Sequence, residues 1–287
     1  MTVPYGSAGH QQFLLYHFVV VFAGCFPASV FALPVLFSRE KNTEGFIPSA
    51  MKILFWIVMI VFTIVTTKIA HYSSLAYFPL SFLGAKYIYE RMHDHTGKKT
   101  IPMVYLIAGI MWSLILLVLI SFPFFKEQII SRSSDLFAVA NMLASNWEFD
   151  EISLFSVLIF LTGIISAFVL FKKGNGIRAL YFHYIAMCIS LAIIQFRVLP
   201  EIERLSQGVF INEIEKLHEQ NIPVITQGMK SYAPYYYGHI AEQYKNIDLN
   251  STRPLCIVTR NTKPVPPEVT ENAERYTRGG YIFYLLQ

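Results

Sequence analysis

Apolar residues gather in long runs up to about residue 196 and become sparser after it. A helix that crosses the hydrocarbon core of a bilayer needs about 20 apolar residues. The pattern predicts six membrane-spanning helices, at residues 13–37, 52–67, 74–89, 101–125, 153–171 and 179–196. The second and third of these are short, and only a polar hinge separates them. The predicted fold is mostly α-helical, a polytopic helical membrane protein with a small C-terminal α/β domain.

Residues 197–287 have the pattern of ordinary soluble sequence. A helix is predicted first, because apolar residues recur at helical spacing and Asn221 stands where such a helix would stop. The apolar positions of this helix are Ile202, Leu205, Val209, Ile214 and Leu217. Three β-branched runs, "IPVITQG", "PLCIVTR" and "GGYIFYLLQ", predict a three-stranded sheet. We expect a helix in "KSYAPYYYGHIAEQY" and a loop with a helical turn in "TKPVPPEVTENAERYT".

Composition and charge agree with a membrane protein. The chain is 54% hydrophobic and only 15% charged, which excludes an ordinary soluble domain. Lys and Arg number nine in the connections at 38–52, 90–100 and 172–178, but only two in the alternate ones. Cytoplasmic loops are enriched in these residues. With six spans, the segment 1–12, the hinge and the domain 197–287 are all predicted to be extracytoplasmic, and 13–196 forms the membrane domain.

The connection at residues 126–152 contains a second amphipathic pattern. Apolar residues recur at helical spacing at Leu136, Val139, Ala140 and Leu143. We expect a helix capped by Ser133 or Ser134. One interpretation is an interfacial helix with Trp147 at headgroup depth, and the other is a packed extramembrane helix.

The three cysteines do not suggest a disulfide framework. Cys25 and Cys188 fall in apolar runs, and Cys256 falls in a predicted strand. We expect all three to be buried, unreactive thiols. The sequence has no P-loop, dinucleotide glycine fingerprint, zinc spacing or nucleophile elbow, and no basic arm for nucleic acid.

The polar hinge between the second and third spans is the main candidate for chemistry. It holds Lys68, His71 and Tyr72 where lipid-facing residues are expected, and Pro79 interrupts the following span. Lys68 either extends to the headgroups while Tyr72 joins an aromatic belt, or it faces a water-filled cavity and binds a phosphate. Pro79 favours the second interpretation, because it frees backbone carbonyls that protein or water must satisfy.

The hinge "TKIAHYSSLAYFPLSFLGA" resembles the late transmembrane signature of polyprenyl-phosphate-sugar glycosyltransferases of the GT-C fold. It is similar in particular to the branch of the protein O-mannosyltransferases and the lipid A aminoarabinose transferase. The signature has a basic residue, a Tyr three or four positions later and a Pro in the next span, matched by Lys68, Tyr72 and Pro79. The segments "HQQFLLYHFVVVFAGCFPASVFAL" and "GMKSYAPYYY" resemble the same branch, so the resemblance covers most of the chain.

The resemblance implies a transferase in the bacterial cytoplasmic (inner) membrane that moves a sugar from a polyprenyl phosphate to a protein or glycolipid hydroxyl. Lys68, His71 and Tyr72 would bind the donor phosphate, with Lys68 stabilising charge on the leaving lipid phosphate. Four residues of the next span would line a lipid groove, and the alternative is plain helix packing or lipid contact: Tyr77, Phe78, Pro79 and Phe82. His10 and His17 would line the cavity or are plain interfacial histidines.

The chain departs from the family pattern in one respect. The catalytic acidic residues of this family lie in a first outer loop that has no counterpart here, so we expect the chain to be the C-terminal half of a longer enzyme, with a separate N-terminal half as a partner. No catalytic residue is assigned, and a requirement for a divalent metal ion is left open. Two other classes remain, a non-enzymatic membrane protein that presents a sensor domain and a transporter with Lys68 in its pathway. A transporter would show inverted repeats, which the sequence lacks.

Overall fold

A computed structural model describes residues 15–38, 45–65, 69–92, 100–239, 254–263, 265 and 273–286. The chain divides into two compact units. The first comprises Met1–Leu116 and Val157–Ser190, and the second comprises Leu117–Ser156 and Leu191–Gln287. The connection that follows residue 116 therefore belongs to the same unit as the C-terminal sheet.

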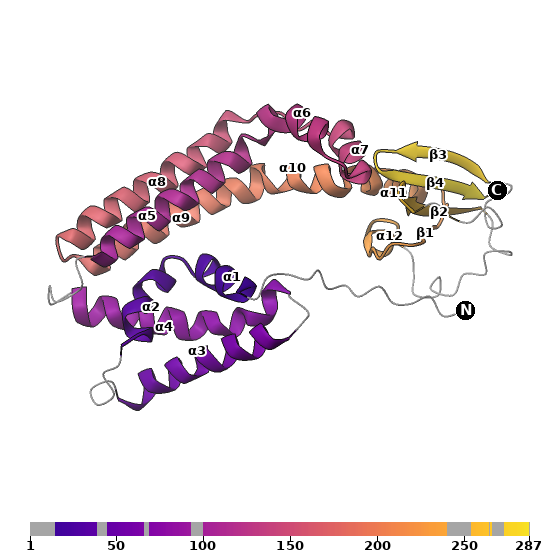
Figure 1. The fold of residues 1–287 in the computed structure, drawn as a ribbon. Helices are drawn as coiled ribbons and strands as arrows, with labels where there is room; N and C mark the ends of the chain where they lie inside the picture. Colours follow the sequence, from indigo (N-terminus) through magenta and orange to yellow (C-terminus); the bar gives the residue numbers. More distant parts are fainter. Residues whose placement is uncertain are drawn as a thin grey trace. The chain divides into compact units, whose positions relative to one another are not determined.

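The first unit is entirely helical in its described part (Figure 1). Its own elements are α1 (Tyr16–Gly24), α2 (Ala28–Leu36), α3 (Phe46–Ile64), η1 (Ala70–Ala76), α4 (Tyr77–Tyr87) and η2 (Ile88–Met92). Three long helices contribute residues to both units: α5 (Thr100–Ile120), α8 (Glu151–Lys172) and α9 (Gly176–Arg197). Buried aromatic side chains such as Phe31 of α2 and Tyr105 of α5 form the core between α2, α5, α8 and α9.

Four described helices are long and apolar enough to cross a membrane. They are Phe46–Ile64, Thr100–Ile120, Glu151–Lys172 and Gly176–Glu219, the last of which joins α9 to the helices that follow it. The predicted span at 13–37 is instead a bent pair, α1 and α2, with an angle of 120°. If that pair is one span, the described residues hold five spans, where the sequence predicted six.

Local chemistry explains both differences from the predicted spans. Pro27 lacks an N–H and interrupts the helix between α1 and α2, and the Ser29 hydroxyl donates to the backbone carbonyl of Phe22 at 2.7 Å. The predicted span at 74–89 consists of the 3-10 turn η1, the 11-residue helix α4 and the π-helical turn η2. Because the predicted orientation depends on six crossings, the extracytoplasmic location of the C-terminal domain stays a prediction.

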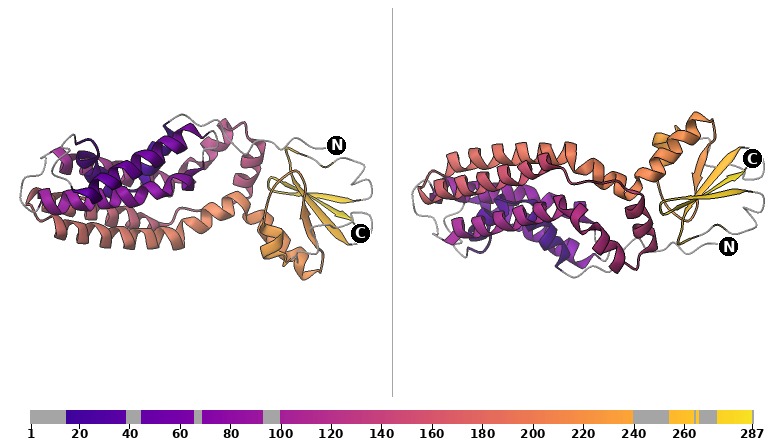
Figure 2. Two further views of the ribbon diagram at one scale, coloured as in Figure 1. Left: turned by 90° about the horizontal axis from the view of Figure 1, so that it is seen from below. Right: turned by 90° about the horizontal axis from the view of Figure 1, so that it is seen from above.

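The second unit combines short helices with a small mixed sheet (Figure 2). Its helices are α6 (Phe122–Arg132), α7 (Leu136–Ala144), α10 (Leu199–Glu203), η3 (Arg204–Gly208), α11 (Val209–Glu219) and α12 (Ala233–Tyr237). Its strands are β1 (Val224–Thr226), β2 (Leu255–Arg260), β3 (Glu274–Arg278) and β4 (Tyr281–Leu286). The strand order is β1-β2-β4-β3, with β1 parallel to β2 and the other pairs antiparallel.

The α11 helix packs its apolar stripe on one face of this sheet. Phe210, Ile214 and Leu217 form a core with Val258 of β2 and Phe283 of β4. The predicted stop is confirmed, because Asn221 adopts a positive φ of 56° just after the helix. The predicted helix in residues 230–244 is the short α12, and its predicted part from residue 240 lies outside the described residues.

Three local predictions are wrong. The expected helical turn before the last strand is partly a fourth strand, β3, because Tyr276 finds a stacking partner in Phe283 at 5.1 Å between ring centroids. The cap of α7 is Asp135, whose Oδ1 accepts from the N–H groups of Phe137 and Ala138 at 3.0 and 3.1 Å. Trp147 is only 8% exposed and stacks on Phe122, so it is not available to headgroups.

Candidate functional site

The polar hinge forms the turn η1 between α3 and α4, and a buried hydrogen bond fastens it to α1. His17 is fully buried, and its Nδ1 lies 3.0 Å from the hydroxyl Oγ of Ser73. The ring of Phe62 on α3 lies against His17, at 5.9 Å between centroids. His17 is therefore enclosed by the helical unit rather than exposed on its surface. A buried imidazole needs a polar partner, and His17 finds one in Ser73 of the hinge. This contact positions the hinge against α1.

Two of the predicted phosphate ligands lie on the outer side of the same turn. His71 is exposed, and Tyr72 is 40% exposed. Their rings meet edge to face at 4.9 Å, and the ring of Tyr72 also lies 6.0 Å from that of Phe62. The turn thus holds one buried polar pair and presents two ring-bearing hydrogen-bond donors. The predicted residues Lys68 and His10 lie outside the described residues.

The predicted groove residues of α4 occupy different environments. Pro79 is buried, and Phe78 is 61% exposed. Tyr77 and Phe82 are partly buried against the core formed by α1 to α4. A Cβ added to Gly24 would lie 2.5 Å from the Tyr77 hydroxyl, so a larger residue there would have to displace the end of the Tyr77 side chain. A lipid groove along this helix stays a prediction.

A second buried polar pair was missed by the sequence analysis. The Tyr105 hydroxyl on α5 lies 2.9 Å from Nδ1 of His183 on α9, and both residues are 1% exposed. The His183 Nε2 is buried without a hydrogen-bond partner among the described residues. Phe26, at the break between α1 and α2, stacks on Tyr105 at 5.6 Å and meets His183 edge-on at 5.7 Å. The only sequence signal was a histidine inside an apolar run, which also describes a packed core residue.

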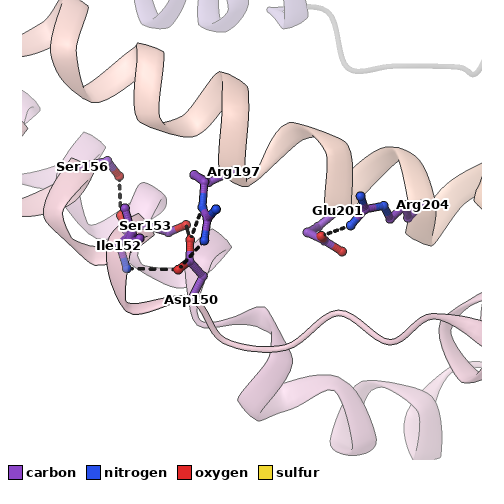
Figure 3. A network of polar contacts seen from close by, with 7 residues as sticks. All are labelled: Asp150, Ile152, Ser153, Ser156, Arg197, Glu201 and Arg204. Atoms are coloured by element: carbon purple, nitrogen blue, oxygen red, sulfur yellow. Dashed lines mark hydrogen bonds and ion pairs between the residues drawn. The ribbon is translucent and has the colours of Figure 1, made fainter.

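A third polar group lies in the second unit, where an ion pair ties α8 to the end of α9 (Figure 3). Arg197 donates from Nε to Asp150 Oδ2 at 2.8 Å and from Nη2 to Oδ1 at 3.1 Å. Asp150 also accepts from the Ser153 hydroxyl and from the N–H of Ile152, at the start of α8. The Arg197 guanidinium holds the pKa of the Asp150 carboxyl well below its usual range. Arg204 and Glu201 form a separate pair one turn further along.

The three cysteines differ in environment. Cys25 and Cys256 are buried as predicted, and burial raises the pKa of the Cys256 thiol to about 12. Cys188 is exposed on α9, so its predicted burial is wrong. It occupies an outward face of an apolar helix.

Neither a search for metal-ligand clusters nor comparison with known proteins assigns a further site. Among the described residues, no three His, Cys, Asp or Glu side chains come together to hold a metal ion. Comparisons of the chain with protein-family models, with curated proteins and with solved structures find no match.

Proposed function

We propose that the protein is a membrane glycosyltransferase. It takes a sugar from a polyprenyl-phosphate donor and passes it to an acceptor hydroxyl at the outer face of the cytoplasmic membrane. The observation that carries this proposal is the turn η1, in which the buried His17–Ser73 contact supports two exposed donors, His71 and Tyr72. A polar turn fixed in this way at the end of a membrane-length helix suits recognition of a lipid-borne anion.

Lys68 supplies the charge in this proposal. A lysine ammonium is a compact cation that suits a phosphate, and it would stabilise the negative charge that develops on the departing lipid phosphate. The rings of His71 and Tyr72 would donate to the phosphate oxygens and orient it. Charge-assisted hydrogen bonds of this kind contribute about 1.5–3 kcal/mol each.

The bent pair α1 and α2 gives independent support. Backbone that leaves the helical conformation at membrane depth persists where it is buried in protein or lines a water-filled cavity. Discontinuous membrane helices are also common at sites that bind polar ligands. The break between Gly24 and Ala28 belongs to the unit that contains η1, and α1 supplies His17 to the hinge.

The binding step tests this proposal without requiring a catalytic acid. The chain is reconstituted in lipid nanodiscs, and binding of a fluorescent polyprenyl phosphate is measured. We expect Lys68→Ala to weaken binding at least about 10-fold, because each 1.4 kcal/mol lost is a factor of ten. Tyr72→Phe removes one donor and should weaken binding by a smaller factor.

The matched control is Lys86→Ala, which removes another lysine of the same unit. Lys86 lies in the last turn of α4 and pairs with Glu90 of η2. This variant should leave binding unchanged. If the wild-type chain and the Lys68→Ala variant bind with equal affinity, Lys68 does not bind the phosphate. The same conclusion follows if Lys86→Ala weakens binding as much as Lys68→Ala does.

One observation favours a second candidate, a non-enzymatic membrane protein that presents its C-terminal sheet. Residues Gly176–Glu219 form one helix of 44 residues, which runs from an apolar span into the sheet domain. A helix that continues from a membrane span into the presented domain suits a sensor. In this alternative, polyprenyl phosphate would not bind, and Lys68→Ala would have no effect on any lipid ligand.

A further inference from the structure

Several apolar side chains of the α7 helix are exposed, whereas its one polar residue is buried. Leu136 and Leu143 are 68% and 66% exposed, and Val139 and Ala140 lie on the same side because they are three or four residues away. On the opposite side, Asn141 is only 4% exposed. A surface helix ordinarily places its apolar stripe toward the core and its polar residues toward water.

The buried side of α7 is fastened to the sheet. The Asn141 Oδ1 accepts from the N–H of Gly280 at 2.8 Å, in the turn between β3 and β4, and its Nδ2 donates to the carbonyl of Ser206. The ring of Phe137 meets that of Tyr281 edge to face at 5.1 Å. Figure 1 shows α7 beside the ends of β3 and β4. The leucines therefore face away from the core of their own unit.

The composition and position of α7 indicate what covers this outer side. The helix, "LFAVANMLA", has no charged residue. It lies in the connection between two helices long enough to span a membrane, α5 and α8. Six residues lie between Ala144 and Glu151, so at most about 25 Å of chain joins α7 to α8. The preceding helix, α6, also exposes Phe124 and Phe125.

We propose that the side of α7 formed by Leu136, Val139, Ala140 and Leu143 lies in the interface of the lipid bilayer. The partner is the lipid surface, since an uncharged apolar stripe tethered at both ends to membrane-length helices matches the boundary between headgroups and acyl chains. Its Asn141 side holds the sheet domain, so α7 fixes that domain at the membrane surface. This inference does not depend on the proposed enzymatic function.

Fluorescence depth measurements on the full chain test the inference. Cys188 is replaced by serine, which leaves two buried cysteines, and an environment-sensitive nitrobenzoxadiazole label is attached at Leu143→Cys. The protein is placed in nanodiscs of phosphatidylethanolamine and phosphatidylglycerol. We expect blue-shifted emission that nitroxide-bearing lipids quench. A label at Glu148→Cys, also on an exposed position of this connection, should show water-like emission with little quenching.

Two outcomes would overturn the proposal. Water-like emission without lipid quenching at Leu143→Cys would place the helix in solvent. Blue-shifted emission without quenching by nitroxide lipids would show that a protein, either a second copy or another partner, covers the stripe. If Leu143→Cys does not fold, Ala140→Cys carries the label on the same side of the helix and gives the same two readings.

Discussion

At the scale of single residues, the contact between Tyr105 and His183 joins two almost fully buried polar groups of the helical unit. Tyr105→Phe removes the hydroxyl and leaves an imidazole buried without its Nδ1 partner. We expect a loss of about 1–3 kcal/mol in the free energy of unfolding, measured by thermal or denaturant unfolding in detergent. The matched control is Tyr181→Phe, because Tyr181 is 66% exposed.

A double variant separates a buried polar penalty from lost packing. Replacing both partners, as Tyr105→Phe with His183→Leu, removes the unsatisfied group, so this variant should unfold less easily than Tyr105→Phe alone. If the double variant is as unstable as the sum of the two single variants, packing rather than hydrogen bonding dominates at this position.

The Asp150–Arg197 pair predicts a pH dependence for the second unit. The pKa of Asp150 is lowered in the folded state, so its contribution to stability is complete above the unfolded value of about 3.9 and is lost as the pH falls through the folded value. We expect Asp150→Asn, which keeps a good helix cap, to lose about 0.5–1 kcal/mol at pH 7. The unfolding free energies of the wild type and Asp150→Asn should converge below pH 3.9, when measured by denaturant titration. A gap that does not change with pH would contradict this.

At the scale of elements, the turn between β3 and β4 determines how closely α7 packs on the sheet. A Cβ at Gly280 would lie 2.6 Å from the Phe137 ring and 2.8 Å from its carbonyl oxygen, so Gly280→Ala should displace α7 from the sheet. Faster hydrogen exchange of the α7 amides would reveal this. Gly208→Ala is the control, because its added Cβ would meet the Arg204 side chain at 3.2 Å and the Glu203 carbonyl oxygen at an ordinary 4.0 Å. If hydrogen exchange of the α7 amides is unchanged in Gly280→Ala, this turn does not hold α7 against the sheet.

The sequence predicted those elements whose signals are local. The stop at Asn221 and the strands β1, β2 and β4 follow from residue type and pattern. The strand β3 did not, because "ERYTR" becomes a strand through pairing with β4. In the candidate site, the polar hinge was evident from the sequence, whereas the His17–Ser73 and Tyr105–His183 contacts join residues 56 and 78 positions apart. Spacing along one helix carries no information on such partners.

At the scale of the whole molecule, each compact unit contains one buried cysteine, which lets labelling follow the two units separately. Cys25 lies in the helical unit and Cys256 in the sheet unit. We expect maleimide to react with neither Cys25 nor Cys256 in the folded protein, because both thiols are buried and the thiolate is the reactive form. With increasing urea in detergent, Cys256 should react before Cys25. The sheet unit depends on burial from water, which urea weakens, whereas membrane-length helices satisfy their backbone hydrogen bonds internally. Mass spectrometry of peptides identifies each site, and simultaneous reaction of Cys25 and Cys256 would show that the two units unfold as one.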